Sequence, residues 1–229
     1  MSVSAIIVAG GKGIRMGAAT RKQYMLLAGK PIFCHTLEAF DACSCIEAIY
    51  LVVPPDDLAI CSEKWISYLK LHNEIHLVAG GLERQDSVYR GIQAVSGQRG
   101  EVVVIHDAVR PFVSSRLIEA CAAEARVSGA CIAGMPLMDT AKWVNSGQIE
   151  RTLDRNTIWL AQTPQAFDLD LIRTAHENAR QDRFMGTDDA MLVERLGRKV
   201  RIIPGSRLNM KITTPEDLAL AEGIINRKS

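Results

Sequence analysis

The chain lacks an excess of either charge, because 27 Lys and Arg side chains stand against 26 Asp and Glu side chains, for a net charge of +1. This balance excludes nucleic-acid or membrane binding driven by bulk electrostatics, although a local basic site is compatible with it. The sequence has no run approaching about 18 apolar residues, the length that predicts a membrane span. It also begins without the basic segment of a secretory signal peptide. We therefore expect a cytoplasmic protein.

The cysteines lack the spacing of a metal site. None of the six forms a C-x-x-C pair, and Cys43-x-Cys45 has no partner pair at zinc spacing. We expect them to be reduced, mostly buried thiols. Internal repeats and low-complexity segments are absent as well. The 229 residues have the length of one α/β domain with a substantial core.

Apolar strand-like runs alternate with helix-like segments through the first two thirds of the chain. We expect strands at 5–8, 48–53, 75–78, 102–105 and 130–136, and helices at 31–42, 56–70 (capped by Asp56 or Asp57), 84–95 and 115–127. Two helices near 168–180 and 188–196, a strand at 200–203 and a helix opened by 214–217 complete the prediction. Such alternation predicts a mostly parallel twisted sheet flanked by helices on both faces.

Residues 137–157 break this alternation. Two short strand-like runs flank Asn145-Ser146-Gly147, which predicts a β-hairpin. An isolated hairpin is marginally stable in water, so we expect this arm to pack against a second subunit.

A glycine-rich loop follows the first expected strand. It runs Ala9-Gly10-Gly11-Lys12-Gly13, and the cations Arg15 and Lys22 come after it. Glycine backbone N–H groups can cradle polyphosphate oxygens, and the two cations would neutralise their charge. The alternative is a tight surface turn with solvated side chains.

The letters of this loop exclude two common nucleotide motifs. Met16 stands where the dinucleotide fingerprint needs glycine, and Gly13 stands where a P-loop needs Ser or Thr after Gly-Lys. The pattern G-G-x-G-x-R-M, with a lysine downstream, is similar to the loop of nucleotidyltransferases.

A second polar segment closes the fourth expected strand, in His106-Asp107-Ala108-Val109-Arg110-Pro111. Asp107 is a candidate ligand for Mg²⁺ carried on a triphosphate, and Arg110 can bind phosphate through two N–H groups. The alternative is a capping Asp beside an exposed Arg. We expect His106 to be a satisfied histidine beside the strand rather than a base.

Further motifs follow in a fixed order: G-G-x-E-R-x-D-S-V at 80–88, D-T-x-K at 139–142, D-R-N at 154–156, T-P-Q at 163–165 and N-x-K-I-T-x-P-E-D at 209–217. Taken alone, Arg155 and Lys211 would be interpreted as ordinary solvated cations. Taken together, the motifs make nearly the whole chain resemble the 2-C-methyl-D-erythritol 4-phosphate cytidylyltransferase family. Ribitol-5-phosphate cytidylyltransferases share several motifs, but the G-G-x-E-R-x-D-S segment, D-T-x-K and Ala108 in place of serine favour the erythritol family.

The resemblance implies a fold, a reaction and a cofactor. The fold is a single-domain, Rossmann-like α/β nucleotidyltransferase fold over residues 1–229, with the arm at about 137–157 serving dimerisation. The reaction transfers the cytidylyl group of CTP to 2-C-methyl-D-erythritol 4-phosphate, by in-line attack without a covalent intermediate. It yields 4-diphosphocytidyl-2-C-methyl-D-erythritol and pyrophosphate, on the non-mevalonate route to isoprenoids. The cofactor is Mg²⁺, with Asp107 as its candidate ligand.

The resemblance also assigns roles by position. Arg15 and Lys22 match residues that stabilise the transition state at the α-phosphate, and Arg155 and Lys211 match residues that position the acceptor. The CTP-binding positions are Ala9, Gly10, Gly11, Gly13, Gly81, Ser87 and Ala108, and the sugar-phosphate pocket comprises Arg110, Thr140, Thr163 and Thr187. The family exchanges the arm across a homodimer, so that Thr140 and Arg155 would act on the neighbour's nucleotide.

Two positions depart from the family pattern. The loop has Val8-Ala9-Gly10-Gly11 where members often have Pro-Ala-Ala-Gly, and Leu208 stands where many members carry Asp. The second departure argues against another carboxylate on the metal side. A ribitol-5-phosphate cytidylyltransferase, a sugar-1-phosphate nucleotidyltransferase and a non-catalytic nucleotide-binding regulator remain the alternatives.

Overall fold

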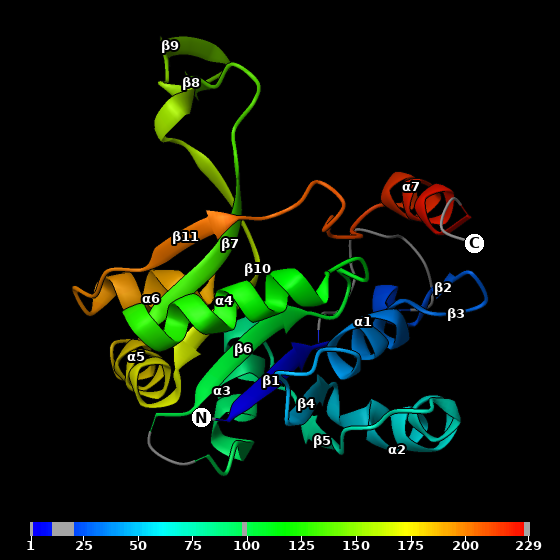
Figure 1. Ribbon diagram of the computed structural model, residues 1–229. Helices are drawn as coiled ribbons and strands as arrows, with labels where there is room; N and C mark the ends of the chain where they lie inside the picture. Colours follow the sequence, from blue (N-terminus) through cyan, green and yellow to red (C-terminus); the bar gives the residue numbers. More distant parts are fainter. Residues whose placement is uncertain (1, 11–20, 98–99, 227–229) are drawn as a thin grey trace.

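The computed structural model describes residues 2–10, 21–97 and 100–226. A seven-stranded sheet of order β11-β7-β10-β6-β1-β4-β5 lies at its centre (Figure 1). Its strands are β1 (Val3–Val8), β4 (Ala48–Val53), β5 (Ile75–Ala79), β6 (Val102–Asp107), β7 (Ala130–Pro136), β10 (Trp159–Asp168) and β11 (Arg201–Pro204). The pairs β1–β4, β1–β6, β4–β5 and β7–β11 are parallel, whereas β10 runs antiparallel to both β6 and β7. The predicted fold class, a mostly parallel α/β sheet, is confirmed.

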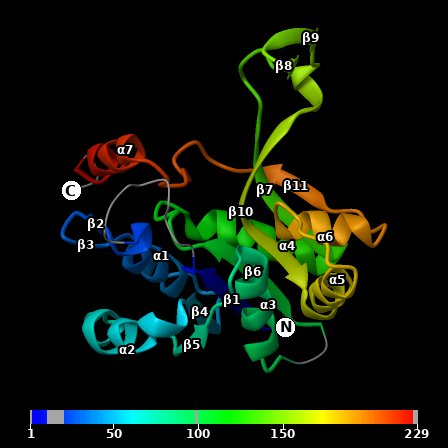
Figure 2. The same ribbon diagram turned by 180° about the vertical axis from the view of Figure 1, so that it is seen from behind.

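Helices cover both faces of the sheet. They are α1 (Ile32–Asp41), α2 (Leu58–Ile60), α3 (Arg84–Ala94), α4 (Ser115–Ser128), α5 (Leu169–Gln181), α6 (Asp189–Arg195) and α7 (Pro215–Asn226). Alternate residues of each strand point to opposite faces, so Ile7 packs in a core with α1 and α4 while Ile6 packs in a core with α3, α5 and α6. Figures 1 and 2 show these two helical layers from opposite sides.

Local sequence signals explain where these helices begin and end. The Ser114 side chain accepts a hydrogen bond from the Leu117 N–H at the start of α4, and Asp168 and Asp188 cap α5 and α6 in the same way. Gly129, with φ +83°, ends α4 in the left-handed conformation that glycine adopts without cost.

The expected helix at 56–70 is only partly right. The segment forms a 3-10 turn at Pro55–Asp57, a single α turn in α2, a π turn at Cys61–Trp65 and a second 3-10 turn at Ile66–Tyr68. The predicted cap is wrong, because Asp57 accepts hydrogen bonds from Tyr24 and Arg21 instead of from a helix N-terminus.

The expected hairpin is confirmed. Strands β8 (Lys142–Asn145) and β9 (Gln148–Thr152) pair antiparallel, and Ser146 and Gly147 both have positive φ, as a two-residue hairpin turn requires. The arm projects away from the sheet between β7 and β10 (Figure 1), and every residue of β8 and β9 is exposed.

Two further expectations bear on the class of protein. All six cysteines are free thiols, five of them buried. None of the helices in the described ranges is long and apolar enough to cross a membrane.

Candidate active site

Strands β1 and β6 bring two of the predicted motifs together. They run parallel, and Val8 at the end of β1 is paired with Asp107 at the end of β6. The glycine-rich loop and the Asp107 motif therefore leave the sheet at the same carboxyl edge, the usual ligand edge of such sheets. A cavity of about 170 Å³ lies there, lined by Val8, Ala9, Lys22, Gln23, Arg84, Asp107, Val109 and Lys211.

Asp107 is the electrostatic centre of this cavity. Its Oδ1 lies 3.1 Å from Arg84 Nε, while its Oδ2 lies 2.8 Å from Lys211 Nζ and 3.7 Å from Arg110 Nε. Burial by itself raises the pKa of Asp107, but Arg84 and then Lys211 outweigh burial and hold the pKa well below its usual range. The carboxylate is therefore ionised at neutral pH.

The neighbouring His106 is not part of this chemistry. Its ring is fully buried and its Nε2 lies 3.2 Å from the carbonyl oxygen of Arg110. Burial lowers the pKa of His106 to about 4, so the imidazole is neutral. The expectation of a satisfied histidine is only partly right, because the buried Nδ1 has no hydrogen-bond partner among the described residues.

Lys22 reaches the cavity from a short 3-10 helix, η2 (Lys22–Tyr24). Two neighbours of Lys22 anchor that helix. The buried Gln23 donates from Nε2 to the Ala9 carbonyl at 2.6 Å, and Tyr24 donates from its hydroxyl to Asp57 at 2.7 Å. Lys22 is thus fixed to the end of β1.

The segment that carries Lys211 is anchored by Asn209, which is fully buried. Asn209 Nδ2 donates to the Thr163 carbonyl at 2.7 Å, and the Asn209 carbonyl accepts from Arg110 Nη1 at 2.8 Å. Thr163 Oγ1 in turn accepts from the Asp107 N–H at 3.1 Å. The C-terminal segment is thereby tied to both β10 and β6.

Three of the predicted CTP-binding residues, Gly10, Gly81 and Ser87, meet at the Ser87 hydroxyl. Gly81 N donates to Ser87 Oγ at 3.1 Å. A Cβ atom placed on Gly10 or on Gly80 would come within 2.9 Å of the same oxygen. Glycines at these positions therefore let the first loop and the loop after β5 approach closely.

Two predicted CTP-binding residues have their backbone groups engaged within the protein. Ala9 donates to Val52 and accepts from Gln23. Ala108 is fully buried, donates to Val8 and accepts from Thr36 Oγ1 at 2.8 Å. Ala108 is also not among the residues that line the cavity, so its N–H and carbonyl groups serve the fold.

Three other predicted residues are not among those that line this cavity. Thr140 and Arg155 belong to the exposed arm, where Arg155 Nη1 donates to the Met138 carbonyl at 2.7 Å. Thr187 is exposed between α5 and α6, and its hydroxyl lies 3.7 Å from Met191 Sδ. A single chain therefore does not bring the arm residues to the cavity (Figure 1). Gly11, Gly13 and Arg15 lie outside the described residues.

Sequence reasoning overlooked Arg84. This side chain bridges Asp107 and Asp189, with Nη1 only 2.8 Å from Asp189 Oδ2. Burial by itself lowers the pKa of Arg84, but Asp189 and then Asp107 reverse that effect and raise it. The signal was present, because Arg84 follows the glycines after β5 and opens α3, which places it at the ligand edge.

The cavity offers few protein ligands to a divalent cation. Among the described residues, no three His, Cys, Asp or Glu side chains gather to form a metal cage. Asp107 offers one buried carboxylate, and both of its oxygens already contact cations. This donor set fits Mg²⁺ that takes its other ligands from substrate phosphates and water.

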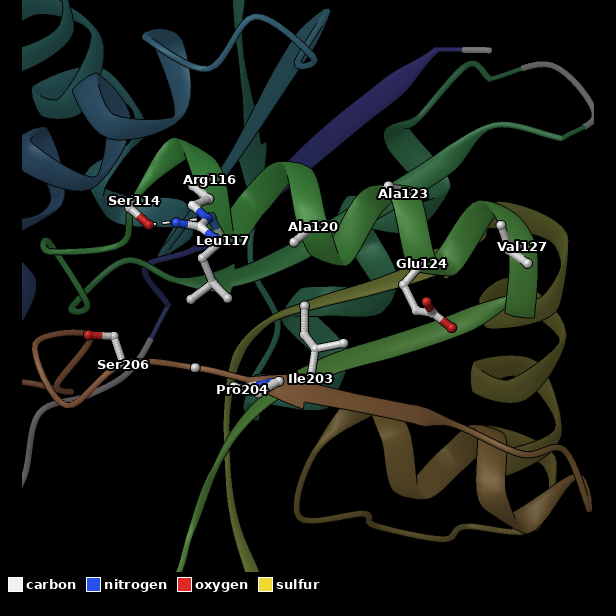
Figure 3. Close-up of a pocket in the computed structure, with 11 residues that line it drawn as sticks. Ser114, Arg116, Leu117, Ala120, Ala123, Glu124, Val127, Ile203, Pro204 and Ser206 are labelled. Carbon is white, nitrogen blue, oxygen red and sulfur yellow. Dashed lines mark hydrogen bonds between the residues drawn. The ribbon is translucent and has the colours of Figure 1, made fainter.

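A larger hollow lies elsewhere and has a different character. It measures about 740 Å³ between α4 and β11, and its wall is mostly small or apolar (Figure 3). The residues that line it include none of those predicted for the site. The cluster around Asp107, not the larger volume, therefore marks the chemistry.

The fold and this charged cleft at the carboxyl edge of the sheet define a class of protein, the α/β nucleotidyltransferases. The family model described as IspD, 2-C-methyl-D-erythritol 4-phosphate cytidylyltransferase, matches residues 3–227. The chain belongs to this family.

Relatives and solved structures agree with that assignment. A 2-C-methyl-D-erythritol 4-phosphate cytidylyltransferase of Geobacter metallireducens is 49% identical over all of this chain and 99% of its own length. One from Syntrophotalea carbinolica is 46% identical over 99% of this chain and 97% of its own. The crystal structure of the Anaerococcus prevotii 4-diphosphocytidyl-2C-methyl-D-erythritol synthase has a TM-score of 0.86 at 33% identity, covering 99% of this chain and 96% of that one. The Thermus thermophilus cytidylyltransferase structure gives 0.80 at 32% identity, covering 99% and 100%.

The predicted activity is therefore confirmed at the level of the family. The chain is a CTP-dependent nucleotidyltransferase that transfers a cytidylyl group to 2-C-methyl-D-erythritol 4-phosphate in isoprenoid biosynthesis.

Proposed function

We propose that the cleft around Asp107 is the catalytic centre for this transfer, with Arg15 and Lys22 on the CTP side and Lys211 on the acceptor side. The observation that carries the proposal is the convergence of Arg84, Arg110 and Lys211 on the single carboxylate of Asp107. Lys22, Arg84 and Lys211 line the cavity, whereas Asp107 is the one acidic side chain among its lining residues. Such a cleft attracts a triphosphate and a phosphorylated acceptor at once.

The proposed reaction is a direct displacement. A phosphate oxygen of the acceptor attacks the α-phosphorus of CTP, the bond to the pyrophosphate oxygen breaks, and pyrophosphate leaves. The attacking phosphate is already ionised near neutral pH, so the site needs no general base. Catalysis then consists of positioning the two anions and of stabilising the charge that develops between them.

The cytidine side of the cleft is assigned to the glycine-rich segments. Gly10 and Gly81 both lie beside Ser87; a Cβ atom on Gly10 would come within 2.9 Å of Ser87 Oγ, and one on Gly81 within 2.3 Å of Asp86 Cβ. We assign the base and ribose to this region, with Ala9, Gly11, Gly13 and Ala108 completing the predicted set.

A divalent cation, for which Mg²⁺ is the candidate, belongs to the same proposal. Asp107 would hold it through one carboxylate oxygen, and the cation would neutralise part of the triphosphate charge. The protein's own contribution is to keep Asp107 ionised and oriented through Arg84 and Lys211.

We also propose a homodimer in which the arm of one chain completes the cleft of the other. The arm exposes Trp143, Val144 and Ile149 by 51%, 52% and 64%, which is apolar surface that a partner would cover. Thr140 and Arg155 would then join Arg110, Thr163 and Thr187 of the neighbouring chain around the acceptor.

Pyrophosphate release tests the assignment. The purified chain is incubated with CTP and Mg²⁺, alone and with 2-C-methyl-D-erythritol 4-phosphate, ribitol 5-phosphate or a sugar 1-phosphate. We expect release with the erythritol phosphate only. Release with ribitol 5-phosphate or a sugar 1-phosphate would favour those alternatives, and CTP binding without any release would favour a regulator.

The transition-state roles have their own test. Arg15→Ala and Lys22→Ala should each lower kcat about 100-fold, as loss of one charge-stabilising donor does, while the Kd for CTP changes far less. A kcat equal to that of the unmodified chain would remove these residues from the mechanism.

A further inference from the structure

Arg84 is held between two carboxylates that lie on different elements. Its Nε donates to Asp107 Oδ1 at 3.1 Å, and its Nη1 donates to Asp189 Oδ2 at 2.8 Å. The side chain is 30% exposed and lines the cavity, whereas Asp189 is 1% exposed. Arg84 therefore connects the protein interior to the open side of the cleft.

Asp189 is itself fixed from two more directions. Its Oδ1 lies 3.2 Å from Nε2 of His176, which is fully buried on α5. Its N–H donates to Gln165 Oε1 on β10, also at 3.2 Å. An ionised side chain this buried and this well bonded has little freedom, so it can act as a rigid support.

The other end of the chain of contacts is Asp107. Arg84 lies against Oδ1, and Lys211 lies against Oδ2. The Arg84 contact thus limits rotation of the carboxylate and turns Oδ2 toward Lys211, the proposed acceptor-side cation, with Arg110 Nε farther away at 3.7 Å. Orientation of Asp107 and orientation of Lys211 both depend on where Arg84 is held.

We propose that Asp189, supported by His176, is a positioning residue for cytidylyl transfer that acts by holding Arg84 across Asp107. This inference rests on the proposed function of the cleft. Asp189 touches neither substrate, and its role is to keep the guanidinium in one place while the anions bind.

A purely structural role for the same pair makes a different prediction. If the Arg84–Asp189 contact only fastened α6 to α3, its loss would lower stability and leave turnover per folded molecule unchanged. If it positions Arg84, its loss lowers kcat, because small displacements of catalytic groups are costly. The two roles therefore separate in kinetics normalised to folded protein.

The test uses the full chain and four variants: Asp189→Asn, Arg84→Gln, the double variant, and Asp182→Asn as a control. Asp189→Asn keeps the shape of the side chain and removes its charge. Asp182→Asn breaks an exposed ion pair of similar length, in which Arg195 Nη2 lies 2.8 Å from Asp182 Oδ2. For each variant, kcat, the KM for both substrates and the unfolding midpoint are measured.

We expect Asp189→Asn to lower kcat about tenfold with the KM for CTP within about threefold, and Asp182→Asn to change neither. In the Arg84→Gln background, Asp189→Asn should have no further effect on kcat, because the guanidinium that Asp189 holds is already absent. Independent, multiplicative losses in the double variant, or an unchanged kcat in Asp189→Asn, would overturn the inference.

His176→Gln provides a second test should Asp189→Asn not fold. It leaves both carboxylates in place and removes the imidazole behind Asp189, together with its stacking on Tyr89, so kcat should fall in the parent chain and not in the Arg84→Gln background. Equal losses in the two backgrounds would contradict the inference. An unmodified chain that releases no pyrophosphate would instead refute the proposed function itself.

Discussion

Lys211 is far from β1 and β6 in the sequence, yet its ammonium group lies 2.8 Å from Asp107. Its side chain is 36% exposed, so truncation removes a charge at the cleft without opening the core. We expect Lys211→Ala to lower kcat about 100-fold, which corresponds to about 3 kcal/mol of transition-state stabilisation. Steady-state kinetics of pyrophosphate release would measure this loss in kcat.

Lys199→Ala is the matched control, since Lys199 is an exposed lysine just before β11. Its kcat should equal that of the parent chain. A Lys211→Ala variant that turns over as fast as Lys199→Ala would show that the ion pair with Asp107 has no part in catalysis.

Asp41 gives a prediction for pH. The backbone N–H groups of Asn73 and His72 donate to its carboxylate at 2.8 and 2.9 Å, and its side chain is only 5% exposed. Burial by itself raises the pKa of Asp41, but the hydrogen bonds from Asn73 and then from His72 lower it below the ordinary value of 3.8. The ionised Asp41 carboxylate therefore stabilises the fold fully above about pH 4, and this contribution is lost as the pH falls through the lowered pKa.

Asp41→Asn should accordingly reduce the free energy of unfolding by about 1–2 kcal/mol at pH 7, and by less as the pH approaches 3. Urea unfolding of both chains across this range checks the sign. A difference that grows on acidification would contradict the assignment.

Residue identities predicted much of the site but not its geometry. Asp107, Arg110, Thr163 and Lys211 were found because each belongs to a motif of distinctive letters, and the structure brings them together. Arg84 lies in the motif at 80–88 but was given no role, and Asp189 was missed because its ion pair with Arg84 spans 105 positions and leaves no local pattern in a single sequence. Only the fold brings α3 and α6 to the same carboxylate.

Among the elements, α3 packs most closely on the sheet at Gly91. A Cβ atom there would lie 2.6 Å from Ile6 Cγ2 and 3.1 Å from Val52 Cγ2, both of them on buried strand residues. Gly91→Ala gains about 1 kcal/mol of helix propensity, but overpacking costs about 1–3 kcal/mol. We expect a net loss of stability in denaturant unfolding.

Gly223 is the natural control, because it lies in α7 with nothing within 4 Å of an added Cβ. Gly223→Ala should raise the free energy of unfolding by about 1 kcal/mol. If both substitutions stabilised the chain equally, the close approach of α3 to β1 would be wrong.

Strand β10 shows why the elements were predicted unevenly. Apolar runs such as 48–53 and 130–136 identified strands directly, whereas the polar letters Gln162-Thr163-Pro164-Gln165 gave no such signal. Proline is disfavoured in a central strand, and here it lies where the register with β7 shifts between Ala161 and Gln165. The same irregular segment, which made β10 hard to predict, also places Thr163 beside Asp107.

For the whole molecule, the proposed dimer makes a complementation prediction. Arg155→Ala chains mixed with Arg15→Ala chains should regain activity, because one cleft of each mixed dimer receives Arg15 from one chain and Arg155 from the other. Random re-association would restore about a quarter of the sites. Activity after co-refolding of equal amounts measures the recovery.

A mixture of Arg15→Ala and Lys22→Ala chains is the control, since both residues belong to the same side of the cleft and no intact site can form. Recovery in the control, or none in the first mixture, would exclude an exchanged arm.

The arm leaves and re-enters the sheet at neighbouring positions, with Pro136 of β7 paired to Trp159 of β10. In topological terms it is an enlarged hairpin loop, so β7 and β10 would be adjacent whatever the length of the insertion between them. A newly synthesised chain can therefore complete its sheet before it encounters another copy. For the proposed dimer, folding and assembly would therefore be separate events in time, and protein concentration would limit only the second.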